Sequence, residues 1–279
     1  MFTLNIKGRL MTINKPVVMG ILNLTPDSFY SGSRVQNEYS LLSRAEAMIE
    51  DGAAILDIGG QSTRPNSQRV DAEEEMRRVL PAIEQVCGRF PQQAISIDTY
   101  YEVVAVKAVE AGAGIVNDIS AGSLDPALLP SVARLGVPYI LTHMKGEPQH
   151  MQKEPGYRNV VLEVFDFLNM KLDMLKATGI NDIIVDPGFG FGKTPAHNFA
   201  LLKNLSWFKQ LNRPVMAGLS RKATIYKTLG ISAEEALNGT TVLHTIALQQ
   251  GALILRAHDV KEALEAIQLC EALKGEEQQ

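Results

Sequence analysis

Short apolar segments alternate with amphipathic segments along most of this chain of 279 residues. The nearly continuous apolar run over residues 17–22 is typical of a parallel strand buried on both faces. Helical spacing follows over residues 39–51, and Gly52 suits the position just after a helix. A weaker alternation over residues 2–14, with Lys7-Gly8 inside it, predicts a β-hairpin ahead of the main fold.

The same strand–helix unit recurs to the end of the chain. The predicted strands cover residues 17–22, 55–58, 94–98, 115–116, 139–142, 183–186, 215–217 and 253–256. Eight such units within about 250 residues favour a (β/α)₈ TIM barrel, with a doubly wound sheet as the alternative. We expect one α/β domain: the hairpin over 1–14, the barrel over 15–274 and a tail over 275–279. Asp125-Pro126 predicts a helix start, and residues 198–211 predict one helix.

Polar residues follow the predicted strands at the point where each strand ends. They are Asn23, Thr63-Arg64, Asp98, Asn117-Asp118, His143, Asp186, Ser220-Arg221-Lys222, Arg256 and His258. In (β/α)₈ barrels the active site lies at the carboxyl ends of the strands. The sequence therefore predicts one site, built from many strands.

Composition and charge narrow the classes of partner. The chain is 46% hydrophobic and 21% charged, as in ordinary globular proteins, and its net charge of −4 gives no footprint for nucleic acid. No apolar run approaches the ~20 residues that span a membrane, and the first residues lack the apolar core of a signal peptide. We expect a cytoplasmic protein that binds neither nucleic acid nor membrane.

Several familiar motifs fail on inspection. Gly192-Lys193-Thr194 resembles the end of a phosphate-binding P-loop, but Pro187 stands where that motif requires glycine. The five histidines show no HExxH spacing, which argues against zinc. Lys222, beside other cations, leaves open a Schiff-base lysine as a minority interpretation.

A set of motifs, in one order along nearly the whole chain, resembles dihydropteroate synthase. They are residues 23–29 (NLTPDSF), 59–65 (GGQSTRP), 98, 117–118, 186–193 (DPGFGFGK), 220–222 (SRK) and 256–259 (RAHD). The family joins 6-hydroxymethyl-7,8-dihydropterin diphosphate to p-aminobenzoate and releases pyrophosphate in folate biosynthesis. The resemblance implies a TIM-barrel transferase that is usually a homodimer, uses Mg²⁺ and is inhibited by sulfonamides.

The resemblance also implies a role for each site residue. Catalytic roles fall to Asp98, Lys222, Arg256 and His258. The pterin is expected at Asp98, Asn117, Asp186 and Lys222, and the diphosphate at Asn23, Thr63, Arg64, Arg256 and His258. The p-aminobenzoate pocket is expected at Phe29, Thr63, Pro65, Phe191, Ser220 and Lys222, and Asn23 is the expected Mg²⁺ ligand. Asp118 is left out of the pterin set, because an acidic residue there also suits a helix cap.

The chain departs from the family pattern at four positions. Gln61 stands where Glu is usual, Asn66 where Gly is common, and Ala257 where Val is frequent, the last with little expected consequence. Ala223 stands where a Ser commonly follows Ser-Arg-Lys, and Thr224 or the backbone is expected to compensate for that hydroxyl. Two alternatives remain: a pterin-dependent methyltransferase barrel and a catalytically silent pterin-binding paralogue. The cationic clusters at 220–222 and 256–258 favour the synthase over both.

Overall fold

The computed structural model describes residues 1–24, 34–61, 69–146, 151 and 155–275. The chain opens with the predicted hairpin, in which β1 (Phe2–Ile6) pairs antiparallel with β2 (Arg9–Ile13) through Lys7-Gly8. Both turn residues have positive φ, which glycine tolerates without strain. This hairpin prediction is confirmed.

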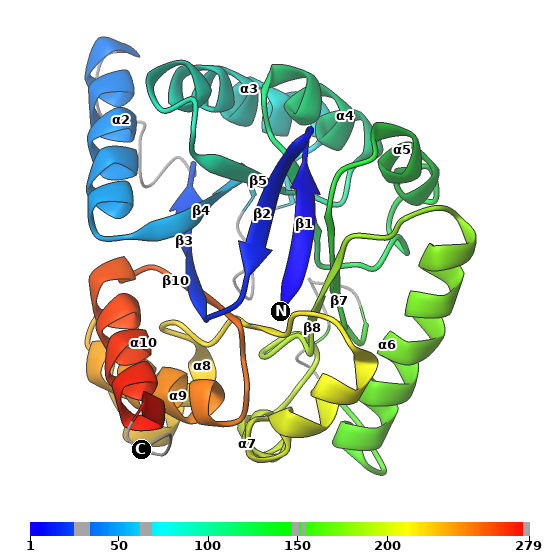
Figure 1. The fold of residues 1–279 in the computed structure, drawn as a ribbon, viewed down its shortest axis with the longest axis vertical. Helices are drawn as coiled ribbons and strands as arrows, with labels where there is room; N and C mark the ends of the chain where they lie inside the picture. Colours follow the sequence, from blue (N-terminus) through cyan, green and yellow to red (C-terminus); the bar gives the residue numbers. More distant parts are fainter. Residues whose placement is uncertain (25–33, 62–68, 147–150, 152–154, 276–279) are drawn as a thin grey trace.

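Eight parallel strands form the central sheet (Figure 1). They are β3 (Val17–Asn23), β4 (Ala53–Gly59), β5 (Ala94–Asp98), β6 (Ile115–Asp118), β7 (Tyr139–Thr142), β8 (Ile183–Asp186), β9 (Met216–Ala217) and β10 (Ile254–Ala257). The order β8-β7-β6-β5-β4-β3-β10-β9 nearly closes, because Val185 of β8 bridges Val215 just before β9. The predicted (β/α)₈ TIM barrel is confirmed.

Helices surround the strands. They are α2 (Arg34–Glu50), α3 (Ala72–Arg89), α4 (Glu102–Ala111), α5 (Leu128–Leu135), α6 (Val160–Ala177), α7 (Pro195–Lys203), α8 (Ala223–Leu229), α9 (Leu237–Gln249) and α10 (Val260–Gly275), with the 3₁₀-helix η1 (Leu205–Leu211) after α7. Their apolar faces join the outer faces of the strands in one large core. That all 279 residues form one domain with boundaries at 14/15 and 274/275 stays a prediction.

Two helix predictions are corrected. Residues 198–211 do not form one helix, because α7 ends at Lys203 and a 3₁₀ segment follows after Asn204. Asp125-Pro126 precedes α5 by a turn rather than starting it: the Asp125 side chain accepts hydrogen bonds from the backbone N–H groups of Ala127 and Glu102. The Asp125 carboxylate thus pairs with an N–H group at the start of α4 as well as with one in its own turn.

The hairpin seals the amino-terminal end of the barrel. Leu4, Ile6 and Ile13 pack in one buried cluster with residues near the beginnings of the strands, such as Met19 and Ile55. An apolar plug at this end leaves the carboxyl end of the barrel for polar side chains.

Candidate functional site

Four acidic or amide side chains lie at the carboxyl ends of neighbouring strands. Asp57 is on β4, Asp98 ends β5, Asn117 is on β6 and Asp186 ends β8. The parallel register places Asp98 beside Asn117. Asp57, Asn117 and Asp186 are at most 3% exposed. Three of the four are predicted pterin residues, and the structure brings them together.

Arg256 on β10 links this group. Its Nε lies 2.6 Å from Asp57 Oδ2, and its Nη2 lies 2.6 Å from Asp98 Oδ2. Asp57 Oδ2 also accepts a hydrogen bond of 3.0 Å from Asn117 Nδ2. We call Asp57, Asp98, Asn117, Asp186 and Arg256 the strand floor.

Asp57 is the functional candidate that sequence reasoning missed. It lies in the middle of an apolar strand, where it ends no segment and belongs to no motif. The available signal is its charge, because an acidic side chain is almost never fully buried without a partner. The sequence does not say which cation pairs with it, because Arg256 lies 199 residues away along the chain.

Burial and charge oppose one another in the strand floor. Burial raises the pKa of Asp98 to about 7, against the attraction of Arg256, and the carboxylates of Asp57 and Glu75 add to the rise. Burial by itself lowers the pKa of Arg256, but Asp57 and Asp98 outweigh it and the pKa is raised. Burial likewise raises the pKa of Asp186, against the attraction of Lys222.

The strand floor also carries acceptors that bind nothing among the described residues. Asp57 Oδ1 and Asn117 Oδ1 are buried and have no hydrogen-bond partner in that part of the chain, and neither does Thr142 Oγ1 on the next strand. Unpaired buried polar atoms are costly, so each calls for an explanation. A ligand rich in N–H groups would satisfy such acceptors.

Beside the strand floor stands Lys222, at the start of α8. Its Nζ donates a hydrogen bond to the Phe189 carbonyl oxygen and lies 4.7 Å from the centre of the Phe191 ring. Burial lowers the pKa of Lys222 to about 8, against the attraction of Asp186. We call residues 187–193 together with residues 220–222 the loop wall. The structure thus brings the predicted residues Phe191 and Lys222 together.

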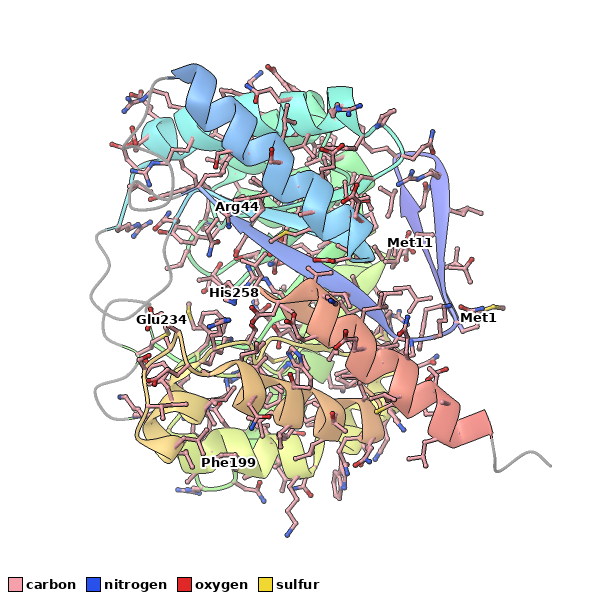
Figure 2. All side chains as sticks on the ribbon, turned by 90° about the vertical axis from the view of Figure 1, so that its left-hand side faces the viewer. Met1, Met11, Arg44, Phe199, Glu234 and His258 are labelled. Atoms are coloured by element: carbon pink, nitrogen blue, oxygen red, sulfur yellow. The ribbon has the colours of Figure 1, made fainter. Side chains whose placement is uncertain are left out.

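Ser220 and His258 form a pair at the end of β10. Ser220 Oγ accepts a hydrogen bond of 3.1 Å from the His258 backbone N–H and lies 3.0 Å from His258 Nδ1. The direction of the hydrogen bond between the hydroxyl and Nδ1 follows the tautomer of the ring, because a hydroxyl can both donate and accept. In Figure 2, His258 lies away from the hairpin residues Met1 and Met11. Ser220 thus orients His258, and its predicted contact with p-aminobenzoate stays a prediction.

Arg221, the other cation of the 220–222 motif, forms hydrogen bonds with neighbouring protein groups. Its Nε and Nη2 donate to the two oxygens of Asp259 at 2.9 and 2.8 Å. Its Nη1 donates to the carbonyl oxygen of Ala233 at 3.1 Å. A paired fork of this kind fixes the turn between β9 and α8.

One of the departures from the family pattern has a local explanation. Gln61 donates from Nε2 to Glu75 Oε2 at 3.0 Å and accepts from the Tyr100 hydroxyl at 2.8 Å, so its amide pairs with both neighbours. The Thr224 hydroxyl is buried and accepts a hydrogen bond of 2.7 Å from Asn198, and its compensation for Ala223 stays a prediction.

Asp118 is a structural residue, consistent with its omission from the predicted pterin set. Its oxygens accept hydrogen bonds of 2.7 Å from the backbone N–H groups of Ser120 and Gly122 and from the Tyr139 hydroxyl. These bonds shape the turn after β6 instead of facing a ligand.

The remaining predicted residues belong to the early loops. Phe29, Thr63, Arg64 and Pro65 lie outside the described residues, as does Asn66. Asn23 ends β3 and is half-buried, with its register partner Gly59 next to Asp98. Within the described ranges no cluster of three His, Cys, Asp or Glu side chains is placed to hold a metal. No helix in those ranges is long and apolar enough to cross a membrane.

Comparison with known proteins agrees with this geometry. Residues 19–258 match the family described as "Pterin binding enzyme". The chain is 41% identical to the dihydropteroate synthase of Escherichia coli K12 over 268 residues, covering 95% of this chain and 94% of that protein. The chain belongs to the dihydropteroate synthase family. The prediction of a transferase of this family is thereby confirmed.

Solved structures of dihydropteroate synthases share the fold. A Yersinia pestis dihydropteroate synthase in a sulfonamide drug complex has a TM-score of 0.92 and 38% identity, covering 98% of this chain and 100% of that chain. The Xanthomonas albilineans enzyme with 4-aminobenzoic acid has a TM-score of 0.90 and 40% identity, covering 98% of each chain. The same enzyme in complex with 7,8-dihydropteroate has a TM-score of 0.87 and 38% identity, again with 98% of each chain covered.

Proposed function

We propose that this protein condenses 6-hydroxymethyl-7,8-dihydropterin diphosphate with p-aminobenzoate to form 7,8-dihydropteroate and pyrophosphate. The observation that carries the proposal is the strand floor with Lys222 beside it: buried acceptors from several strands next to a guanidinium and an ammonium. Related enzymes of the same fold bind 4-aminobenzoic acid and 7,8-dihydropteroate, which supports the same pair of ligands here.

The strand floor suits the edge of a pterin ring. A pterin presents amino and ring N–H donors beside a carbonyl acceptor. Asn117 and Asp186 supply buried acceptors, Asp98 supplies a half-buried one, and Lys222 supplies a donor. A ring with a different donor pattern would leave these buried groups unpaired, which discriminates strongly between ligands.

The reaction we propose is a dissociative substitution. The bond between the methylene carbon and the diphosphate oxygen breaks first, and its electron pair leaves with the diphosphate. The lone pair of the p-aminobenzoate nitrogen then forms the new C–N bond, and that nitrogen loses a proton. Arg256 and a ring N–H of His258 stabilise the negative charge on the departing diphosphate, while Asp98 faces the pterin cation.

The described residues offer Mg²⁺ one amide oxygen at the end of β3. Mg²⁺ commonly takes one or two protein oxygens and completes its shell with substrate phosphates and water. Asn23 offers one amide oxygen at the end of β3, and the described residues hold no acidic cluster that would bind the ion alone. We propose that Asn23 holds the ion together with the diphosphate, where Mg²⁺ neutralises charge on the leaving group.

For p-aminobenzoate we propose a place against the loop wall. The Phe191 ring is 9% exposed and lies beside Lys222, so an aromatic ring and a cation are available to a benzoate. Because a related enzyme binds a sulfonamide drug, we propose that sulfonamides compete with p-aminobenzoate here. Roles for Phe29, Thr63, Arg64 and Pro65 stay predictions.

We also propose, from the family resemblance, that the protein is a homodimer. An apolar groove of about 500 Å³ runs between α9 and α10, and Leu269 and Leu273 beside it are 74% and 63% exposed. A second copy of the chain would cover this face. Sedimentation analysis tests this: a single monomeric species at micromolar concentration would contradict it. A cytoplasmic location stays a prediction.

The activity is tested by pyrophosphate release from purified protein. Dihydropterin diphosphate, p-aminobenzoate and Mg²⁺ are supplied together, and each is then omitted in turn. We expect release only with all three, and formation of dihydropteroate in equal amount. Tight binding of pterin diphosphate without release would support a silent pterin-binding paralogue, and methyl transfer from a reduced folate would support the methyltransferase.

A further inference from the structure

Lys193 ends the loop after β8, and its side chain is buried. The residue is 2% exposed, which is rare for lysine. Its Nζ donates to the carbonyl oxygens of Gly188 at 2.9 Å, Phe191 at 3.0 Å and His143 at 3.2 Å. Nζ also lies 2.8 Å from His143 Nδ1. One amine therefore joins three points of the loop wall and the end of β7.

Three of these partners are carbonyl oxygens, which accept a hydrogen bond from an amine in either charge state. Burial lowers the pKa of Lys193 well below its usual value, against the attraction of Asp186. Burial also lowers the pKa of His143 to about 3, so its ring is neutral. The amine therefore joins the loop as a hydrogen-bond donor, and this role does not depend on its charge.

The backbone around Lys193 is built to bring these carbonyl groups close. Gly188 and Gly192 both have positive φ. A Cβ at Gly188 would lie 1.9 Å from the His143 carbonyl oxygen, and a Cβ at Gly192 would lie 2.1 Å from the Lys145 carbonyl oxygen. The loop after β8 thus packs against the residues that end and follow β7 with no room for a side chain, and the Lys193 amine donates to carbonyl groups gathered there.

The same loop carries two groups that face Lys222. The Phe189 carbonyl oxygen lies between Gly188 and Phe191 in the sequence and accepts from Lys222 Nζ. The Phe191 ring packs with Tyr100, Ile119 and Met151 and lies against that ammonium. Both groups lie within the stretch whose ends the Lys193 amine holds.

We propose that Lys193 is a positioning residue of the proposed synthase: its side-chain amine holds the loop 187–193 in the conformation that places the Phe189 carbonyl and the Phe191 ring against Lys222. Lys193 touches no substrate in this account. We expect its larger effect on the p-aminobenzoate side, because Asp57, Asp98 and Asn117 of the strand floor lie on other elements. A smaller effect can reach the pterin side through Asp186, which accepts a hydrogen bond of 2.7 Å from the Gly188 N–H. This inference rests on the proposed function for its kinetic consequence, but not for its structural one.

The test uses Lys193→Met, which keeps the length of the side chain and removes its donors and charge. Lys203→Met, at an exposed lysine at the end of α7, is the matched control. Two readouts are measured on the full-length chain: hydrogen exchange of the backbone N–H groups over residues 187–193, and the separate Michaelis constants for the two substrates. Retention of the fold is checked by circular dichroism and thermal unfolding.

We expect exchange over residues 187–193 to rise in Lys193→Met while exchange in β4, β5 and β6 stays unchanged. We expect the KM for p-aminobenzoate to rise by about tenfold or more. Displacement of a binding or catalytic group by about 1 Å can lower the rate by about a hundredfold. The KM for pterin diphosphate should change several-fold less than the KM for p-aminobenzoate, and all values for Lys203→Met should stay within about twofold.

Two results would overturn the proposal: unchanged exchange over residues 187–193, or equal changes in the two Michaelis constants in a folded variant. If Lys193→Met does not fold, Lys193→Gln, which keeps an N–H donor, is measured in its place against the same two criteria. Exchange needs no turnover. An inactive wild-type chain would therefore contradict the proposed function, while exchange would still decide whether Lys193 holds the loop.

Discussion

The strand floor and the loop wall are built in opposite ways. In the strand floor, side chains bind side chains: Arg256 spans Asp57 and Asp98, and Asn117 completes the set. In the loop wall, the two lysines bind the backbone: Lys193 and Lys222 donate to carbonyl groups of residues 188, 189 and 191. Strand register brings the first region together, whereas amine donors hold the glycine-rich loop of the second.

The largest effect on the strand floor is expected from Arg256→Met. Loss of the guanidinium removes the proposed donor to the diphosphate and leaves Asp57 buried without its cation. We expect turnover to fall by about a hundred- to a thousandfold. We expect the free energy of unfolding to fall by about 3–5 kcal/mol. Turnover and urea unfolding measure the two effects, with exposed Arg134→Met as the control; turnover within about threefold of wild type would contradict the assignment.

Asp57→Asn tests the strand floor more gently. The amide keeps the shape of the side chain but removes the charge that pairs with Arg256 and the strong acceptor for Asn117. We expect the KM for pterin diphosphate to rise by about tenfold. Exposed Asp51→Asn serves as the control. A KM for pterin diphosphate equal to that of wild type would show that Asp57 does not orient the ligand-facing groups.

The pH dependence of kcat/KM joins the two regions. Asp98 of the strand floor, with a pKa of about 7, should act when ionised, so the rate should rise as pH increases through this value. Lys222 of the loop wall, with a pKa of about 8, should act when protonated, so the rate should fall as pH increases further. The expected profile is bell-shaped with a narrow maximum between these values. A profile that is flat across this range would refute both assignments.

The smallest expected effect comes from Gln61→Glu, behind the strand floor. Burial raises the pKa of Glu75, and a second carboxyl group beside it would raise the shared pKa further. A folded pKa above the unfolded value of about 4.3 means that stability is retained at low pH and lost as pH rises. We expect the variant to lose about 1–3 kcal/mol at neutral pH and less in acid.

Urea unfolding midpoints at two pH values measure this loss, with exposed Gln210→Glu as the control. An equal midpoint difference from wild type at both pH values would rule out a shared proton between positions 61 and 75. In the wild-type chain, the Gln61 amide forms hydrogen bonds with Glu75 and Tyr100 without adding a charge.

The sequence predicts the barrel because each strand ends in a recognisable polar residue and each helix carries its own signal. Asp98, Asn117 and Asp186 are found for that reason, and the structure brings them together at one end of the barrel. Sequence reasoning misses Asp57 because its role depends on an ion pair with Arg256, which is distant in the sequence. No local pattern encodes such a pairing.

The loop wall shows a second limit of sequence reasoning. In the sequence, Lys193 belongs to a segment that resembles a phosphate-binding motif but lacks its first glycine. In the structure, its amine contacts carbonyl oxygens, which every residue carries and no sequence pattern marks. The 3₁₀ segment after α7 and the late start of α5 escape for a related reason, because backbone and side-chain bonds beyond the local window decide them.

The most direct test of the division between strand floor and loop wall is one set of Michaelis constants, measured side by side for wild type, Asp57→Asn and Lys193→Met. The account predicts a crossover: Asp57→Asn raises mainly the KM for pterin diphosphate, and Lys193→Met raises mainly the KM for p-aminobenzoate, each by about tenfold. Equal changes in both constants for both variants would contradict it, and would mean that the two regions act as one unit.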